Sequence, residues 1–237
     1  GVAFSPGDIL AYDYASTTWS IYFDASDVGV TKALDDFVLM NDGSILMTFK
    51  SRMKLLNGSG TQITIEPQDI ARFVPSQLDD VTAGWFEQYF DGSDVGLTTS
   101  GEKIDALAIR PDGTLLISPS GAATVKSGSV NVKAQDEDLL AFTLTSSGAT
   151  TSGTWHTTLA LDGSTLAGMA VENVTAAWAD PDSQTIYLAV TSNFTIKGSK
   201  GTNRTILSVS LAGDVATYWD LSATGFNGQV DGLHIVR

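Results

Sequence analysis

The chain of 237 residues contains no cysteine, which excludes a disulfide scaffold, a thiol nucleophile and a zinc site with cysteine ligands. Charged residues make up only 17% of the chain, and 13 basic residues against 27 acidic ones give a net charge of −14. An acidic surface repels phosphate groups, so we expect no binding to nucleic acid or to anionic membranes. No stretch reaches the apolar length that spans a bilayer, which predicts no membrane insertion.

Signs of catalysis are equally scarce. His156 and His234 are the only histidines, and the sequence has no nucleophile elbow, zinc-protease motif or glycine-rich phosphate loop. The many acidic residues leave a glycosidase-type pair of carboxylates open as an alternative. The absences predict a protein that is not an enzyme.

What the sequence does contain is a repeat of about 70 residues. The segment YFDGSDVGL at residues 89–97 is nearly repeated as YFDASDVGV at residues 22–30. Weaker copies occur at residues 161–164 and 219–222. A short apolar segment follows each of the four copies, and its second residue falls at positions 35, 105, 175 and 231, which are 70, 70 and 56 residues apart. A second set of matching segments begins at positions 8, 69, 138 and 205 and keeps step with the first.

Each repeat predicts four strands, which we name a to d in chain order. Strand a is expected at residues 34–39, 104–109, 174–179 and 230–235, and the connection from b to c is expected to be a variable loop. The C-terminus supplies a strand a, and the N-terminus supplies strands c and d. Together they predict an all-β, four-bladed propeller with four-stranded blades, whose last blade is closed by both ends of the chain. A β-sandwich and a β-solenoid are the alternatives.

This interpretation makes residues 1–237 a single propeller domain, with blades at about 30–90, 100–160, 170–220 and 228–237 joined with 1–24. The string YFDGSDVGL…IDAL…PDGTLL…DEDLLAF, at residues 89–142, resembles repeats of large bacterial secreted and surface proteins. Four blades whose inner strand opens as Ile-Asp-Ala does at residues 104–106 also loosely resemble hemopexin-like propellers. That resemblance implies the architecture alone, because the repeat here is longer and the disulfide of that family is absent.

Strand a carries the first candidate site. In a propeller its opening residues surround the mouth of a central tunnel, so their oxygen atoms suit a hard cation, calcium or sodium. The alternative is that each Asp caps a turn or accepts backbone N–H groups at the start of its strand. The predicted ligands are Asp35, beside Asp36, together with Asp105, Thr175 and Asp231. The motifs at Asp24–Asp27 and Asp91–Asp94 superficially suggest calcium loops, but Asx-turns explain them as well.

The second candidate site is a binding surface. Trp19, Trp85 and Trp155 recur at one point of the repeat, which predicts that they pack between blades. Trp178 and Trp219 break the pattern, so they are candidates for stacking on a sugar or peptide, with a core role as the alternative. Lys197, Lys200 and Arg204 form a basic patch in a b-to-c connection, where loops on a rigid scaffold favour recognition.

We therefore predict an extracellular or cell-surface binding or adhesion module whose partner is a glycan or a protein. The sequence ends inside an expected strand, which favours a monomeric domain of a larger protein. A structural spacer in a surface protein is the second interpretation, and a glycan-processing enzyme is the third.

Overall fold

The computed structural model describes residues 2–236, which form an all-β protein with five short 3-10 helices. Three four-stranded antiparallel sheets follow one another along the chain. In each sheet the strands are neighbours in the predicted order a, b, c, d. They are β3 (Leu34–Leu39), β4 (Ile45–Phe49), β7 (Ile70–Gln77) and β8 (Ala83–Phe90); β9 (Ile104–Ile109), β10 (Leu115–Pro119), β13 (Leu140–Ser146) and β14 (Ser152–Trp155); and β15 (Val174–Ala179), β16 (Ile186–Val190), β19 (Thr205–Val209) and β20 (Val215–Asp220).

The connections from b to c contain hairpins that we expected to be loops. They are β5 (Met53–Leu56) with β6 (Gln62–Ile65), β11 (Ala123–Ser127) with β12 (Val130–Ala134), and β17 (Phe194–Ile196) with β18 (Ser199–Gly201). Buried and exposed residues alternate along β5 and β11, because successive side chains of a strand point to opposite faces. That alternation was present in the sequence as a signal for strands.

The fourth unit differs from the expectation of four strands. Strands β1 (Ile9–Asp13) and β2 (Thr18–Phe23) form a two-stranded sheet, while residues 2–4 and 230–236 belong to no strand. In the other units strand a pairs only with strand b, so a C-terminal segment without a strand b has no neighbouring strand with which to form a ladder. The prediction of four strands in each unit is therefore confirmed for three units, as four-stranded sheets, and wrong for the fourth.

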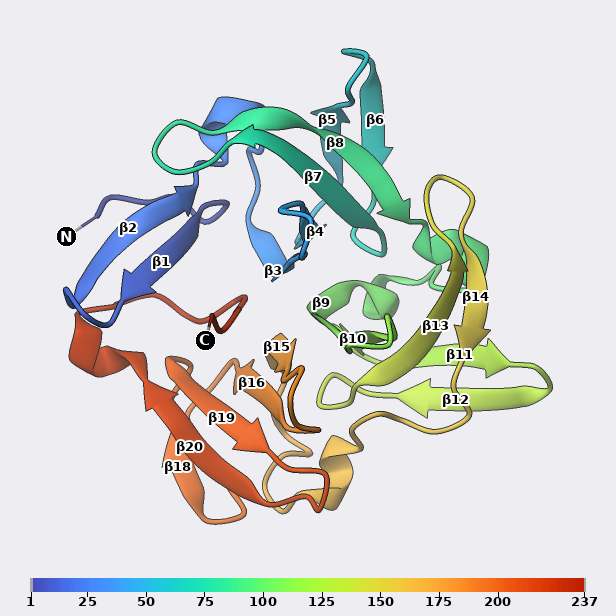
Figure 1. The fold of residues 1–237 in the computed structure, drawn as a ribbon. Helices are drawn as coiled ribbons and strands as arrows, with labels where there is room; N and C mark the ends of the chain where they lie inside the picture. Colours follow the sequence, from blue (N-terminus) through green and yellow to red (C-terminus); the bar gives the residue numbers. More distant parts are fainter. Residues whose placement is uncertain (1, 237) are drawn as a thin grey trace.

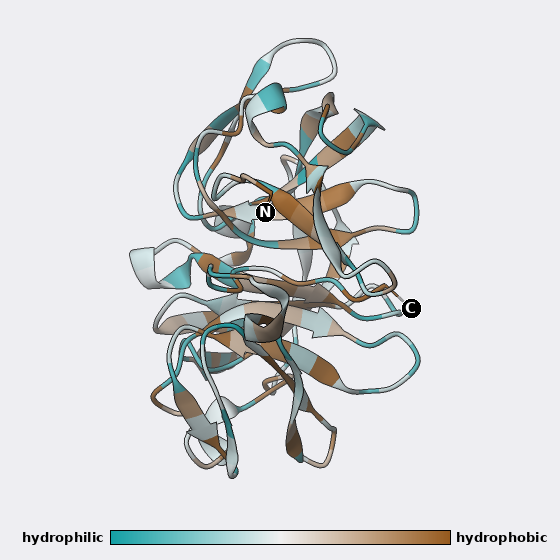
Figure 2. Ribbon diagram, turned by 90° about the vertical axis from the view of Figure 1, so that its left-hand side faces the viewer, coloured by the Kyte–Doolittle hydropathy of each residue, from teal (hydrophilic) through white to brown (hydrophobic). Residues whose placement is uncertain are grey.

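The sheets are arranged around a common centre, with β3, β9 and β15 innermost and the C-terminal segment entering between β1 and β15 (Figure 1). Four apolar clusters fill the spaces between successive units, and each draws its residues from two neighbours. The last cluster joins the third sheet to both ends of the chain, through Trp178, Trp19 and Leu233 among others. Figure 2 shows that hydrophobic residues concentrate within the strands and hydrophilic residues in the connecting loops.

One buried carboxylate joins all four units at this centre. Asp36 is fully buried and accepts hydrogen bonds from the backbone N–H groups of Phe37 (2.7 Å), Leu107 (2.8 Å), Ala177 (3.0 Å) and Leu233 (3.3 Å). These donors hold the same position in the four repeats. Burial raises the pKa of Asp36 well above its ordinary value, and the N–H donors lower it part of the way back.

We predict that Asp36→Ala lowers the free energy of unfolding by at least about 3 kcal/mol, because buried N–H groups lose their acceptor. Urea unfolding of the variant and the wild type measures the difference. An added chloride ion can take the place of the carboxylate among the N–H groups, so chloride should stabilise Asp36→Ala more than the wild type. Equal stability of the two proteins without chloride would contradict the central role of this carboxylate.

Candidate functional site

Six aromatic side chains form a continuous row where the two ends of the chain meet. Tyr12 lies 4.9 Å from Trp19 and 5.3 Å from Trp219 between ring centroids, and Tyr14 lies 5.1 Å from Trp219. Phe226 extends the row from Trp19 at 5.5 Å, and Phe4 stacks on Phe226 at 6.3 Å. We call this set the aromatic row: Phe4, Tyr12, Tyr14, Trp19, Trp219 and Phe226.

Strand pairing positions these rings. Tyr12 stands directly opposite Trp19 in the hairpin of β1 and β2, and Tyr14 follows in the turn with its ring centroid 5.1 Å from that of Tyr12. The indole N–H of Trp19 lies 3.3 Å from both the backbone oxygen and the hydroxyl of Thr224. These contacts fix the ring against the connection that follows β20. Trp219 lies on β20 beside a register shift, an irregularity of the kind that re-aims side chains.

The row is open to solvent. Tyr14 is 65% exposed and Phe4 is 50% exposed, and the other four rings are partly buried. The pKa of Tyr14 is raised by partial burial and by the neighbouring Tyr218 and Tyr12, so three phenol groups lie close together beside the indole rings. An exposed apolar surface with hydroxyl groups at its edge is typical of a binding surface.

The structure separates the two tryptophans that we predicted as ligand contacts. Trp219 belongs to the aromatic row, but Trp178 is only 7% exposed and packs between Tyr187 and His234. The prediction for Trp178 is corrected on this ground, because a ring inside an apolar cluster has no free face for a ligand.

Trp85 also differs from expectation. Phe86, not Trp85, stands opposite Phe73, as Trp155 stands opposite Phe142. A shift of one residue moves a side chain to the other face of a strand, so Trp85 is 36% exposed instead of packed between sheets.

The predicted basic patch is largely engaged by the chain itself. The Lys197 ammonium donates to the backbone oxygen of Gly213 at 2.7 Å, and the Arg204 guanidinium lies near Asp220 and helps to lower the pKa of that carboxyl group. Backbone and side-chain hydrogen bonds from Ser222 are the larger causes of that lowered pKa. Lys200 is exposed on β18. Within residues 2–236 no hydrogen bond or ion pair engages the side chain of Lys200, so it is the one exposed cation of the patch left for a partner.

At the centre, the structure brings together the acidic residues predicted for a cation. In each four-stranded sheet the register of strands a and b shifts at the second residue of strand a, and such bulges re-aim side chains. Asp35 and Asp105 share a hydrogen bond. Burial is the main cause that raises the pKa of both carboxyl groups; the charge of Asp231 raises these pKa values further, and the charge of Lys50 lowers them. Thr175 does not bond to these carboxylates; its hydroxyl donates to the backbone oxygen of Val230 at 2.8 Å.

The carboxylates of this acidic cluster are compensated from within the protein. Lys50 donates to Asp231 at 3.2 Å, and the Asn173 amide donates to Asp105 at 2.6 Å. Burial, followed by the charge of Asp105, raises the pKa of Asp35 to about 8, so Asp35 holds a proton at neutral pH and Asp105 accepts it. Within residues 2–236 no group of three His, Asp or Glu side chains has the geometry of a metal site. Calcium or sodium at this position stays a prediction.

The motifs that superficially suggested calcium loops form Asx-turns. The Asp24 carboxylate accepts from the N–H of Ser26 at 2.9 Å, and the Asp91 carboxylate accepts from the N–H of Ser93 at 3.0 Å. The two histidines lie far apart in the chain and have different surroundings. His156 is bonded to Thr143 at 2.9 Å, and burial lowers the pKa of His234.

The sequence contained a signal for the aromatic row that we missed. Tyr12, Tyr14 and Trp19 crowd the N-terminal unit, and Tyr218, Trp219 and Phe226 crowd the C-terminal one. The predicted closure of the chain ends would have brought the two groups together. None of the helices in residues 2–236 has the length and apolar character needed to cross a membrane.

No protein-family model and no curated protein matches this chain. Among solved structures it is similar to the "extracellular domain of the putative one component system BT4673 from B. thetaiotaomicron", with a TM-score of 0.26 and 10% sequence identity. The match covers 93% of this chain and only 38% of that one. A similarity this low supports no conclusion about function, which has to be argued from the residues themselves.

The protonated Asp35 makes stability depend on pH. Its pKa is about 8 in the folded protein, against about 3.9 in an unfolded chain, so stability falls as pH rises between these values. Asp35→Asn keeps an N–H donor for Asp105 without titrating. We predict that the variant gains on the order of 2 kcal/mol over the wild type at pH 9 and little at pH 4.

Urea unfolding at pH 4, 7 and 9 measures this difference. Asp42→Asn is the control, because the pKa of Asp42 is lowered by hydrogen bonds from Ser44 and its contribution is lost on the acidic side instead. An Asp35→Asn variant with the same pH profile as the wild type would show that Asp35 is ionised in the folded protein.

Proposed function

We propose that this protein is an extracellular, non-catalytic binding module that recognises a glycan through the aromatic row. The observation that carries the proposal is the exposure of Tyr14 and Phe4 at the ends of a row whose central rings are anchored by packing. Pyranose rings have apolar faces that stack on indole and phenol rings, and hydroxyl rims that bond to phenols. The net charge of −14 disfavours an anionic ligand, which is consistent with an uncharged glycan.

The shape of the row favours a polymer over a small molecule. The contacts run from Phe4 through Phe226, Trp19 and Trp219 to Tyr14, so successive rings can meet successive sugar units. A spacer domain would need rings only to seal the chain ends, and the inner rings already do so by joining the fourth apolar cluster. Tyr14 is exposed and therefore contributes little to the packing between the chain ends.

We predict that Tyr14→Ala weakens glycan binding at least tenfold, about 1.4 kcal/mol, and changes the free energy of unfolding by less than about 1 kcal/mol. A glycan array with the wild type identifies the ligand, and calorimetry with that ligand measures the loss. Trp85→Ala, which removes an exposed tryptophan outside the row, should bind as the wild type does.

Each outcome separates the functions that the sequence left open. Absence of any glycan ligand for the wild type would favour a spacer. Binding that survives Tyr14→Ala would place the site elsewhere, and release of a shortened glycan during the assay would identify an enzyme.

We propose also that the four units form a closed, four-bladed propeller in which residues 230–236 take the place of the fourth strand a. Three contacts support this: Leu233 donates to Asp36, the N–H of Val230 donates to Asn203, and the oxygen of Val230 accepts from Thr175. Removal of residues 227–237 should therefore abolish the single cooperative thermal transition or lower its midpoint by more than about 10 °C. An unchanged midpoint in calorimetry would show that the ring does not depend on its C-terminal segment.

A further inference from the structure

The connection from strand d of one unit to strand a of the next, which we call the crossing, meets the tip of the c–d hairpin of the following unit. We call each of these contacts a seam. Two seams are closed by a set of three hydrogen bonds, which we call the clasp. At the first seam the N–H of Asp24 donates to the Thr82 hydroxyl at 2.8 Å, and the N–H of Thr82 donates to the Asp27 carboxylate at 2.9 Å. A third bond runs from the N–H of Asp79 to the oxygen of Tyr22 at 3.0 Å. Thr82 is almost fully buried by these contacts.

The second seam repeats the clasp. The N–H of Asp91 donates to the Thr151 hydroxyl at 2.8 Å, and the N–H of Thr151 donates to the Asp94 carboxylate at 2.8 Å. The third bond runs from the N–H of Gly148 to the oxygen of Tyr89, again at 2.8 Å. The crossing therefore offers a fixed set of groups to a threonine-bearing loop: a backbone oxygen, an N–H two residues later and a carboxylate.

The third seam has the crossing but lacks the loop. The c–d hairpin of the third unit turns tightly at residues 210–213, where the N–H of Gly213 donates to the oxygen of Ser210, and this turn contains no threonine. Thr165 stands where Asp27 and Asp94 stand in the clasped seams. In the part of the chain that the structure describes, the oxygen of Ala160 and the N–H of Asp162 have no hydrogen-bond partner.

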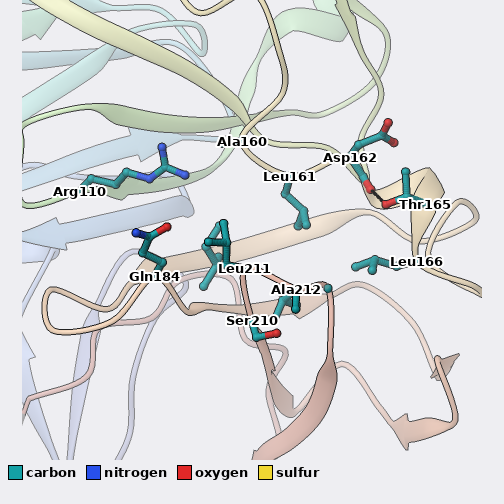
Figure 3. Close-up of a pocket in the computed structure, with 13 residues that line it drawn as sticks. Arg110, Ala160, Leu161, Asp162, Thr165, Leu166, Gln184, Ser210, Leu211 and Ala212 are labelled. Carbon is teal, nitrogen blue, oxygen red and sulfur yellow. Dashed lines mark hydrogen bonds between the residues drawn. The ribbon is translucent and has the colours of Figure 1, made fainter.

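A groove of about 250 Å³ lies in this place. Figure 3 shows Arg110 and Gln184 at one end and Asp162 and Thr165 at the other, with Leu161 and Leu211 between them. Leu211 is 77% exposed at its rim. The pKa of Asp112 is lowered by hydrogen bonds from Thr114 and, to a smaller extent, by the charge of Arg110, but no carboxylate of residues 2–236 lies within ion-pair distance of Arg110. Its guanidinium therefore has N–H donors left for an acidic group of a ligand.

We propose that the third seam is a second binding site, which takes an acidic, threonine- or serine-bearing loop of a partner protein in place of the missing clasp. The hydroxyl of the loop accepts from the N–H of Asp162, a backbone N–H of the loop donates to the oxygen of Ala160, and an acidic residue pairs with Arg110. The loop of the first unit, LDDVT at residues 78–82, has this composition and fills the equivalent seam. The site is independent of the aromatic row.

The test uses a cyclic hairpin peptide with the sequence of residues 74–85 and the full chain labelled with ¹⁵N. We expect saturable shifts of the amide signals of Asp162 and Leu211 at millimolar peptide. Leu211→Asp should weaken binding at least fivefold, while Leu56→Asp, an equally drastic change at an exposed leucine on β5, should leave it unchanged. A peptide with valine in place of threonine should bind at least threefold more weakly.

Thr165→Asp supplies the carboxylate of the clasped seams and should tighten binding at least threefold. The proposal is overturned if no signal around the groove moves, if Leu211→Asp binds as the wild type does, or if Thr165→Asp fails to improve binding. Since glycan binding by Tyr14→Ala is measured separately, failure here leaves the proposed function of the aromatic row untouched.

Discussion

The hydrogen bonds of one carboxylate, that of Asp36, link the four units at the centre of the structure. The equivalent residues in the other units are Ala106, Ala176 and Gly232, and their small size leaves room for a single larger side chain. A Cβ atom on Gly232 would lie 2.9 Å from the Phe37 ring and 3.0 Å from the Asp36 carboxylate, so the fourth position requires glycine. One unit thus supplies the acceptor and all four supply donors, which a strictly symmetric repeat could not do.

With the centre fixed, the units differ mainly in how their outer seams are closed. Two seams are clasped by threonine-bearing loops, one is covered by the aromatic row, and one is open. The connection between successive units is therefore covered in different ways at the four seams. Where a loop covers it, its polar groups are hydrogen-bonded; where rings or nothing cover it, it leaves the exposed surface that we propose for binding.

The acidic cluster at the centre shows why a set of converging carboxylates need not be a metal site. Repulsion between Asp35 and Asp105 is relieved by a shared proton, and Asp231 is paired with Lys50. Burial makes protonation of one member less costly than keeping both charged. The chain thus has its own means of assembling these residues, and it ties their ionisation to pH.

The sequence by itself determined the repeat, the all-β class and the order of strands in three units. The bounds of β3, β9 and β15 were predicted to the residue, because apolar runs bounded by turn residues are local signals. It also placed Asp35, Asp105 and Asp231 together through their matching positions in the repeat.

Only the tertiary structure decided which residues are exposed at the seams. Trp178 and Trp219 have the same chemistry, yet one is buried between Tyr187 and His234 and the other lies in an open row. A one-residue offset in pairing sent Trp85 outward, and the short turn at residues 210–213 left a groove. These features depend on register and on contacts between distant segments, which no local pattern of residues specifies.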